Sequence, residues 1–144
     1  MVIEGGKIRD VMRSPRSAEL PSESRELSGF ICPGFIDLQI NGAFGVDVGP
    51  DTKALEALVR ELPKTGVTSF LPTAASWPAE HYADFLDTLE EAPSSSGAAI
   101  LGAHIEGPFL SLARKGAHDP ANLHSVDLEL TERLVGSGMA RFPA

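Results

Sequence analysis

The sequence is poor in the residues that cross-link small domains and in the apolar runs that cross membranes. Its single cysteine, Cys32, cannot form a disulfide within the chain, which favours a reducing compartment, the cytoplasm. Cys32 follows Phe30 and Ile31, and this apolar context predicts that its thiol packs rather than reacts. No apolar run reaches the roughly 20 residues that span a bilayer, and the first ten residues lack the pattern of a secretory signal.

Positive charge is also scarce. The chain has 12 Lys and Arg against 20 Asp and Glu, a net charge of −8 at pH 7. Adjacent basic residues occur once, at Arg114 and Lys115. We therefore expect neither nucleic acid nor an anionic membrane surface as a partner. A hydrophobic fraction of 42% with 22% charged residues is instead typical of a soluble globular domain.

Strand-like and helix-like patterns alternate after a polar, turn-rich segment over residues 1–29. Apolar and polar residues alternate in the first strand. Apolar residues recur at helical spacing after Asp51, which is suited to cap a helix, and again after a second possible cap at either Ser125 or Asp127. The predicted elements are strand 36–40, helix 52–62, strand 67–71 closed by Pro72, helix 82–89, strand 100–105 and helix 128–135. This order predicts an α/β fold with a parallel sheet, either doubly wound or part of a (β/α)₈ barrel.

Polar side chains gather at the predicted carboxyl ends of the strands, where parallel sheets place their chemistry. One face of the first strand carries Asp37, Gln39 and Asn41, although parallel strands are usually apolar on both faces. The strand therefore faces a polar site, or else it lies at an edge with one face in water.

A second polar group closes the third predicted strand. His104 and Glu106 are two residues apart, so they share a face, and both side chains can bind a divalent ion. Two ligands do not complete a metal site, so a hydrogen-bonded polar pair is an equal alternative. The loop RKGAH at 114–118 is suited to an anion or a hydroxyl group, and is equally compatible with a solvated loop.

The stretches PGFIDLQINGAFGVDV, GVTSFLPT, GAHIEGPFLS and KGAH together resemble the N-acetylglucosamine-6-phosphate deacetylases of the amidohydrolase superfamily. The resemblance runs in order from Phe30 to Asn122, which makes it more specific than any single motif. It implies metal-dependent deacetylation of N-acetylglucosamine 6-phosphate to glucosamine 6-phosphate and acetate, in amino-sugar catabolism, usually by a homodimer. It also implies that residues 33–144 are the first three βα units of a (β/α)₈ TIM barrel, truncated at the carboxyl terminus, and that residues 1–32 belong to a small β-sandwich.

The same resemblance implies roles for individual residues. Glu106 corresponds to a ligand of the divalent metal ion, which would be Zn, Fe or Mn, and Ala117 and His118 correspond to substrate contacts. Gln39 and Asn41 stand where many amidohydrolases carry a His-x-His pair, which implies one metal ion per subunit rather than two. His104 matches no known ligand and is expected to orient Glu106 from outside the coordination shell.

The family's catalytic aspartate and two further metal-binding histidines are expected downstream, so no general acid or base is assigned within the 144 residues. Two alternatives to a deacetylase stay open. In the first, the chain is a non-catalytic fragment, such as half of a split assembly. In the second, it is part of another amidohydrolase that acts on a cyclic amide. The pair Gln39 and Asn41 and the KGAH loop count against the cyclic amide.

Overall fold

The computed structural model describes residues 1–13, 16, 19–20, 22–92 and 97–136. The chain forms two compact units, Met1–Cys32 and Pro33–Ala144. We describe each unit by itself. That the first unit belongs to a β-sandwich, and the second to a barrel, stays a prediction.

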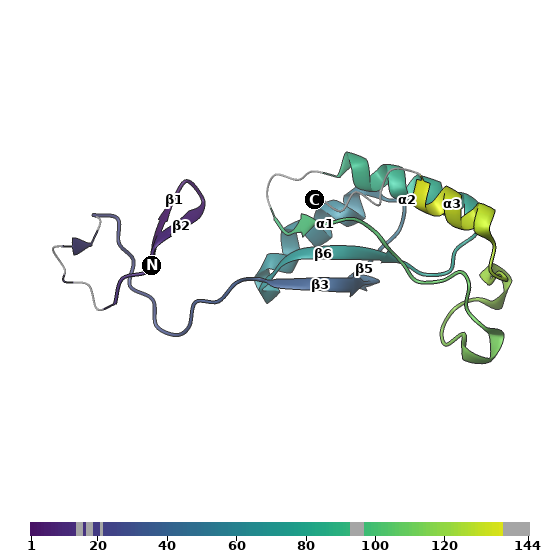
Figure 1. Cartoon of the computed structure of the whole chain (residues 1–144), viewed down its shortest axis with the longest axis horizontal. Coiled ribbons are helices and arrows are strands. Elements are labelled where there is room, and N and C mark those ends of the chain that lie inside the picture. Colours follow the sequence, from purple (N-terminus) through teal and green to yellow (C-terminus); the bar gives the residue numbers. More distant parts are fainter. Residues whose placement is uncertain (14–15, 17–18, 21, 93–96, 137–144) are drawn as a thin grey trace. The chain divides into compact units, whose positions relative to one another are not determined.

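The first unit contains a hairpin that the sequence pattern did not predict. Strands β1 (Val2–Glu4) and β2 (Lys7–Asp10) pair antiparallel, and Gly5 and Gly6 form the turn with φ angles of 57° and 74° (Figure 1). A two-residue turn with both φ angles positive matches the twist of a hairpin, and glycine adopts it without strain. The strands have three and four residues, mostly exposed, so they lack the alternation that reveals a longer strand.

The thiol of Cys32 is exposed, so the prediction that it packs in a core is wrong. Its neighbours Phe30 and Ile31 are also exposed, at 102% and 65%. These residues lie in a segment without strand or helix, which has no buried face on which an apolar side chain could pack.

Strand β6 (Val67–Ala74) is the centre of the second unit. It pairs in parallel with β3 (Phe35–Ile40) on one side and with β7 (Ala99–Ile100) and β8 (His104–Ile105) on the other (Figure 1). The predicted α/β fold with a parallel sheet is therefore confirmed. The strand continues through Pro72, where the sequence predicted its end, because proline here costs one backbone donor without breaking the extended conformation.

The predicted strand 100–105 is interrupted and forms two short strands, β7 and β8. Residues 101–103 lie opposite two residues of β6, and one of these is Pro72, which has no N–H to donate. The backbone N–H of Glu106 nevertheless donates to the carbonyl oxygen of Ala74 at 2.8 Å. The segment therefore stays beside β6 as far as Glu106.

The three predicted helices are confirmed as α1 (Thr52–Glu61), α2 (Ala79–Glu91) and α3 (Leu128–Gly136). Asp51 Oδ1 accepts from the N–H of Lys53 at 2.9 Å, and Asp127 Oδ1 accepts from the N–H of Leu130 at 3.1 Å, as expected for helix caps. A 3₁₀ turn, η2 (Leu62–Thr65), follows α1, and a short hairpin of β4 (Gly42–Ala43) and β5 (Val46–Asp47) was not predicted. No helix among the described residues is long and apolar enough to cross a membrane.

The two faces of the sheet differ sharply. Helices α1 and α2 pack their apolar residues on the face of β3 and β6 that carries Ile40, Phe70 and Ala74. The buried residues of this core also include Leu55, Leu58, Val59, Tyr82, Phe85 and Leu86. Thr73 lies on the opposite face of β6, because side chains alternate along a strand. Gln39 reaches the same face at the end of β3, where the register shifts between Asp37 and Ile40, so the prediction that Asp37, Gln39 and Asn41 share one regularly alternating face is wrong. This polar face contains the candidate site.

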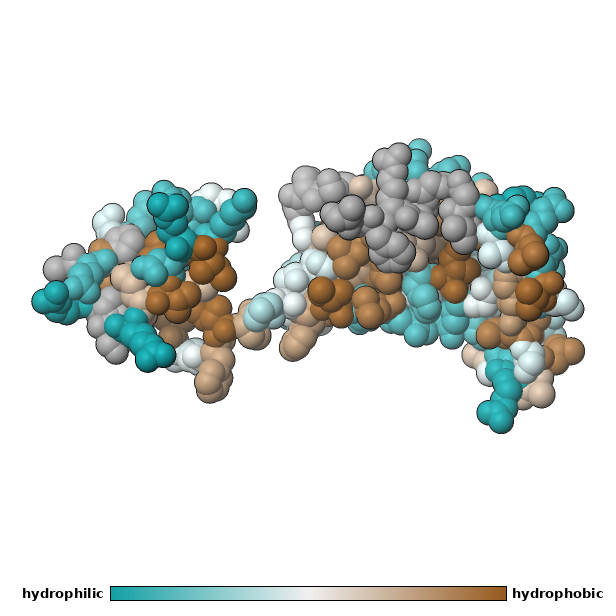
Figure 2. Space-filling model, viewed as in Figure 1, coloured by the Kyte–Doolittle hydropathy of each residue, from teal (hydrophilic) through white to brown (hydrophobic). Residues whose placement is uncertain are grey.

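Strand β3 leaves apolar side chains uncovered. Phe35, Ile36 and Leu38 are exposed at 64%, 61% and 62%, and apolar side chains reach the surface of the second unit (Figure 2). The outer edge of β3 has no strand partner among the described residues. An unpaired edge with apolar side chains promotes association with other chains.

We expect the 144-residue chain to associate in solution and Leu38→Lys to lower its average mass, because a charge beside the open edge of β3 opposes pairing between chains. Light scattering over a range of concentrations measures this. Val126→Lys is the matched control, since Val126 is 79% exposed and lies outside the sheet. A monomeric parent chain, or equal effects of both substitutions, would contradict the expectation.

Candidate active site

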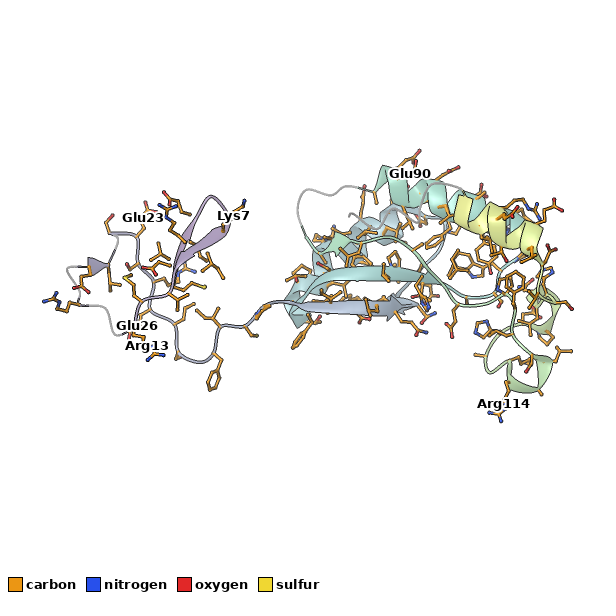
Figure 3. The ribbon with its side chains drawn as sticks, in the orientation of Figure 1. Lys7, Arg13, Glu23, Glu26, Glu90 and Arg114 are labelled. Atoms are coloured by element: carbon orange, nitrogen blue, oxygen red, sulfur yellow. The ribbon has the colours of Figure 1, made fainter. Side chains whose placement is uncertain are left out.

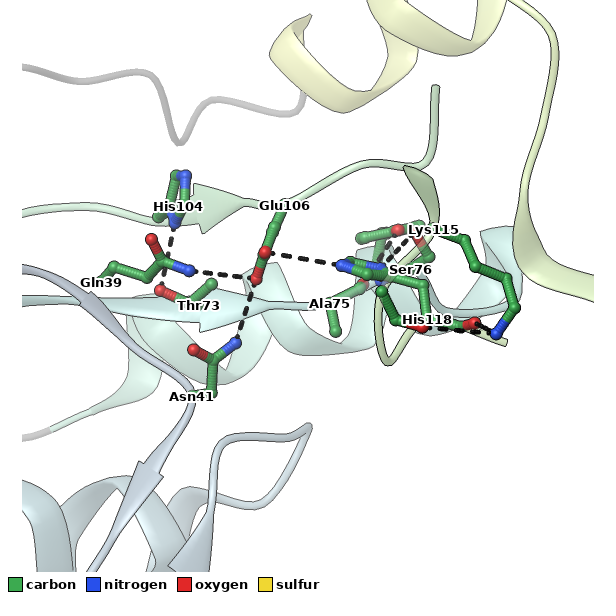
Figure 4. A network of polar contacts seen from close by, with 11 residues as sticks. Gln39, Asn41, Thr73, Ala75, Ser76, His104, Glu106, Lys115 and His118 are labelled. Atoms are coloured by element: carbon green, nitrogen blue, oxygen red, sulfur yellow. Dashed lines mark hydrogen bonds and ion pairs between the residues drawn. The ribbon is translucent and has the colours of Figure 1, made fainter. Parts of the chain in front are cut away.

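Glu106 follows β8 directly, and side chains from β3 and its end converge on its carboxylate. Gln39 Nε2 donates to Glu106 Oε2 at 3.1 Å, and Asn41 Nδ2 donates to the same oxygen at 3.3 Å (Figure 4). Parallel pairing through β6 brings the carboxyl ends of β3 and β8 together, so residues 65 and 67 positions apart meet. The two amide groups are neutral, so they orient the carboxylate without cancelling its charge.

His118 approaches the other oxygen of the same carboxylate from a loop. Its Nε2 lies 3.4 Å from Glu106 Oε1, and the two side chains are 10% and 35% exposed. The loop contains two 3₁₀ turns, η3 (Leu112–Arg114) and η4 (Pro120–Asn122), on either side of His118. The structure thus brings together Gln39, Asn41, Glu106 and His118, four of the six residues for which the resemblance implies a role.

Ser76, just beyond the end of β6, holds the inner side of the His118 ring. The Ser76 N–H donates to His118 Nδ1 at 3.2 Å, and the Ser76 hydroxyl lies 2.9 Å from the same nitrogen. Asn122 Nδ2 donates to the carbonyl oxygen of Ser76 at 3.1 Å, which fixes the loop to the end of β6. Ser76 is 4% exposed, so these contacts are shielded from water.

His104 and Ala117 lie outside the contacts to Glu106. His104 Nδ1 is 3.2 Å from the hydroxyl of Thr73, its register partner on β6. Ala117 is exposed in the turn before His118. The roles that the resemblance implies for these residues stay predictions.

The basic pair of the loop divides into two different roles. Lys115 folds back and Nζ donates to the carbonyl oxygens of Gly116 and His118 at 3.3 and 3.1 Å, so it braces the turn. Arg114 is exposed at the tip of the loop, where its side chain points outward (Figure 3). The pair therefore forms no joint anion site beside the carboxylate.

Sequence reasoning missed Ser76, Thr73 and Asn122. Ser76 and Asn122 are single polar residues in turns, where such residues are common, so no pattern distinguished them. Thr73 lay beyond the end predicted for its strand at Pro72. The period-two alternation continued through the proline would have placed Thr73 on the polar face.

The donor set of the site consists of one carboxylate, two neutral amides and one imidazole. Glu106 offers a partly exposed carboxylate oxygen, a ligand suited to Zn, Fe or Mn. Among the described residues, no group of three or more His, Cys, Asp or Glu side chains could hold a metal ion. The carboxylate of Glu106 therefore fits one position of a coordination shell.

Comparison with known proteins identifies the relatives of the chain. No family profile matches it. The N-acetylglucosamine-6-phosphate deacetylase of Mus musculus is 38% identical over 132 residues, and that of Bos taurus is 40% identical over 134 residues; these alignments cover 87% and 88% of the chain. The crystal structure of the N-acetylglucosamine-6-phosphate deacetylase from Pasteurella multocida matches 77% of the chain with a TM-score of 0.63 and 31% identity.

These similarities define the chain first as a relative of sugar-phosphate deacetylases. More particularly, it corresponds to the amino-terminal part of the N-acetylglucosamine-6-phosphate deacetylases, as the sequence motifs indicated. The chain spans about a third of the length of these relatives, 32% for the mouse protein and 33% for the bovine one.

The contact between Gly107 and Ser76 predicts a position-specific loss of stability. A Cβ atom at Gly107, where φ is +97°, would lie 2.3 Å from Ser76 Oγ, whereas one at Gly116, where φ is +58°, meets nothing within 4 Å. Backbone strain costs about 1–2 kcal/mol at both positions, and overpacking adds about 1–3 kcal/mol at Gly107 alone. Gly107→Ala is therefore expected to lower the free energy of unfolding by more than Gly116→Ala does.

Urea unfolding in the Leu38→Lys background, where association is suppressed, measures this difference. The difference should shrink when Ser76→Ala is added, since the hydroxyl that causes the overlap is gone. An equal decrease in the free energy of unfolding for Gly107→Ala and Gly116→Ala would show that overlap with Ser76 does not destabilise the Gly107 variant.

Proposed function

We propose that these residues form one wall of the active site of an N-acetylglucosamine-6-phosphate deacetylase, which hydrolyses the acetamido C–N bond to give glucosamine 6-phosphate and acetate. The observation that carries the proposal is the convergence of Gln39, Asn41 and His118 on the carboxylate of Glu106. The names of the relatives supply the substrate.

We further propose that the parallel sheet is the first part of a (β/α)₈ barrel and that the first unit is part of a small β-sandwich. The polar face at the carboxyl ends of β3 and β8 supports the barrel, because barrels carry their active sites there. A homodimer in the cytoplasm is the assembly and compartment that we propose for the complete enzyme.

Glu106 is the residue that would hold the metal ion, and Gln39 and Asn41 would orient it. Because both are neutral amides, the site offers one anionic ligand in this region, which supports one metal ion per subunit. When bound, a divalent ion supplies Lewis-acid activation of a water molecule and of the amide carbonyl.

His118 contributes a polar group beside the carboxylate without competing for the same oxygen. Its ring approaches Oε1 of Glu106, whereas the two amides bind Oε2. A substrate held next to Glu106 would therefore meet an imidazole nitrogen as a hydrogen-bonding partner. His104, bonded to Thr73 on the same polar face, would support the strand end that carries Glu106.

The direct test is an assay of acetate release from N-acetylglucosamine 6-phosphate with added zinc, iron or manganese. We expect no turnover from the 144-residue chain alone, because its described residues supply fewer than three metal ligands, and turnover from a complete deacetylase chain that contains these residues. The 4-epimer, N-acetylgalactosamine 6-phosphate, is the control for sugar specificity. Absence of turnover from the complete chain would favour the alternative that the chain is a non-catalytic fragment. Turnover of cyclic amides would favour the alternative that it belongs to another amidohydrolase.

Glu106→Gln in the complete chain should lower metal content and turnover by orders of magnitude, because the anionic ligand is lost. Glu106→Asp should also fail, since the shorter side chain withdraws the oxygen from its position. Elemental analysis measures the metal. Glu90→Gln is the matched control, because Glu90 is exposed on α2 and its side chain points outward from that helix (Figure 3). Full metal content in Glu106→Gln would refute the ligand assignment.

His118→Asn in the complete chain should raise KM or lower kcat/KM by roughly tenfold or more and leave the metal content intact, because the ring binds substrate rather than metal. Steady-state kinetics and elemental analysis together check this. His81→Asn, an exposed histidine on α2, is the control. Loss of metal from His118→Asn alone would make His118 a ligand instead.

A further inference from the structure

The ring of His118 is held from its inner side by a residue with no assigned role. Both polar groups of Ser76 reach His118 Nδ1, the backbone N–H at 3.2 Å and the hydroxyl oxygen at 2.9 Å. A backbone N–H can only donate, so Nδ1 must present its lone pair and cannot carry a proton in this arrangement. The proton of the neutral ring then lies on Nε2, the nitrogen that faces Glu106.

Ser76 is itself held by three hydrogen bonds around it, so it can determine which nitrogen of His118 carries the proton. Tyr82 on α2 accepts from the N–H of Trp77 and donates to the carbonyl oxygen of Ala75, both at 3.1 Å, and thereby clamps the residues on either side of Ser76. Burial raises the pKa of the Tyr82 phenol, which keeps its hydroxyl protonated and able to donate. The amide of Asn122 binds the carbonyl oxygen of Ser76.

Gly107 supplies the space for this arrangement. A side chain there would overlap Ser76 Oγ, so the glycine after Glu106 allows the hydroxyl to sit against the strand end. The low exposure of Ser76 excludes water as a competing partner and strengthens its hydrogen bonds.

We propose that Ser76 is a positioning residue that fixes His118 as the tautomer with its proton on Nε2, so that the ring acts as a hydrogen-bond donor toward an acceptor oxygen of the substrate. Its part in the reaction rests on the proposed function. The tautomer itself does not, because it follows from contacts within these 144 residues.

The tautomer can be measured directly by NMR on the ¹⁵N-labelled chain in the Leu38→Lys background, at about pH 8.5, roughly two units above the usual pKa of imidazole. We expect His118 Nδ1 to have the ¹⁵N shift of an unprotonated, hydrogen-bonded nitrogen and Nε2 that of a protonated one. The exposed ring of His81 is the internal reference for a solvated histidine. If the chain still associates, magic-angle spinning of the same sample gives the same readout.

Variants separate positioning from packing. Ser76→Ala removes the hydroxyl contact, so the Nδ1 shift should move toward that of His81, whereas Ser76→Thr keeps both donors and should retain the parent shift. Asn122→Ala is the second variant if Ser76→Ala does not fold, because it loosens Ser76 and so weakens its contacts with Nδ1, while Ser76 and His118 themselves stay unchanged. A proton on Nδ1 in the parent chain, or the parent shift in both Ser76→Ala and Asn122→Ala, would overturn the proposal.

Steady-state kinetics of the complete chain test the proposed role of Ser76 in the reaction. Ser76→Ala should lower kcat/KM by roughly three- to tenfold at full metal content, with recovery in Ser76→Thr. His118→Gln, whose amide can place a donor near the position of Nε2, should retain more activity than His118→Asn. Equal activity of Ser76→Ala and the parent chain would refute the role in the reaction, whereas a parent chain without any turnover would refute the proposed function and leave the NMR result standing.

Discussion

Parallel backbone pairing along β6 is the constraint on which the second unit depends. It fixes how far β3 and the segment through β8 extend, so that their carboxyl ends lie at the same edge of the sheet. The hydrogen bond from the N–H of Glu106 to Ala74 is the last link of this ladder and places the carboxylate within reach of Gln39. This pairing is what brings Gln39 and Asn41 into contact with Glu106, which is more than 60 positions away in the sequence.

The side chains on the two faces of the sheet have different roles. Ile40, Phe70 and Ala74 face the helices and form the core with them, at a density where the loss of one side chain is costly. Gln39 and Thr73 face the opposite way and line the polar face. This division explains why β3 carries the buried Ile40 next to Gln39, which binds the carboxylate of Glu106.

A network of hydrogen bonds connects the polar face to the helical layer. Tyr82 on α2 holds the residues beside Ser76, Ser76 holds the inner nitrogen of His118, and His118 faces Glu106. The loop that carries His118 is therefore attached to the core through hydrogen bonds of the backbone and of side chains, at the buried residue Ser76. Lys115 stabilises the turn itself. Such support keeps a hydrogen-bonding group in one orientation, which is what differential recognition of a substrate requires.

Local signals in the sequence were sufficient for the helices, the parallel order of the strands and the relationship to the deacetylases. Asp51 caps α1 through a bond two residues away, so the start of that helix is readable without the fold. The alternation predicted around Ile40 is wrong in part, because Ile36 and Leu38 are exposed whereas Ile40 is buried, and the register of β3 shifts between Asp37 and Ile40. The exposure of Cys32, this register shift and the contact between Ser76 and His118 were decided by tertiary structure alone. Their physical cause is the same: each depends on which distant segment lies alongside, and a serine and a histidine 42 residues apart leave no periodic trace of the bond that joins them.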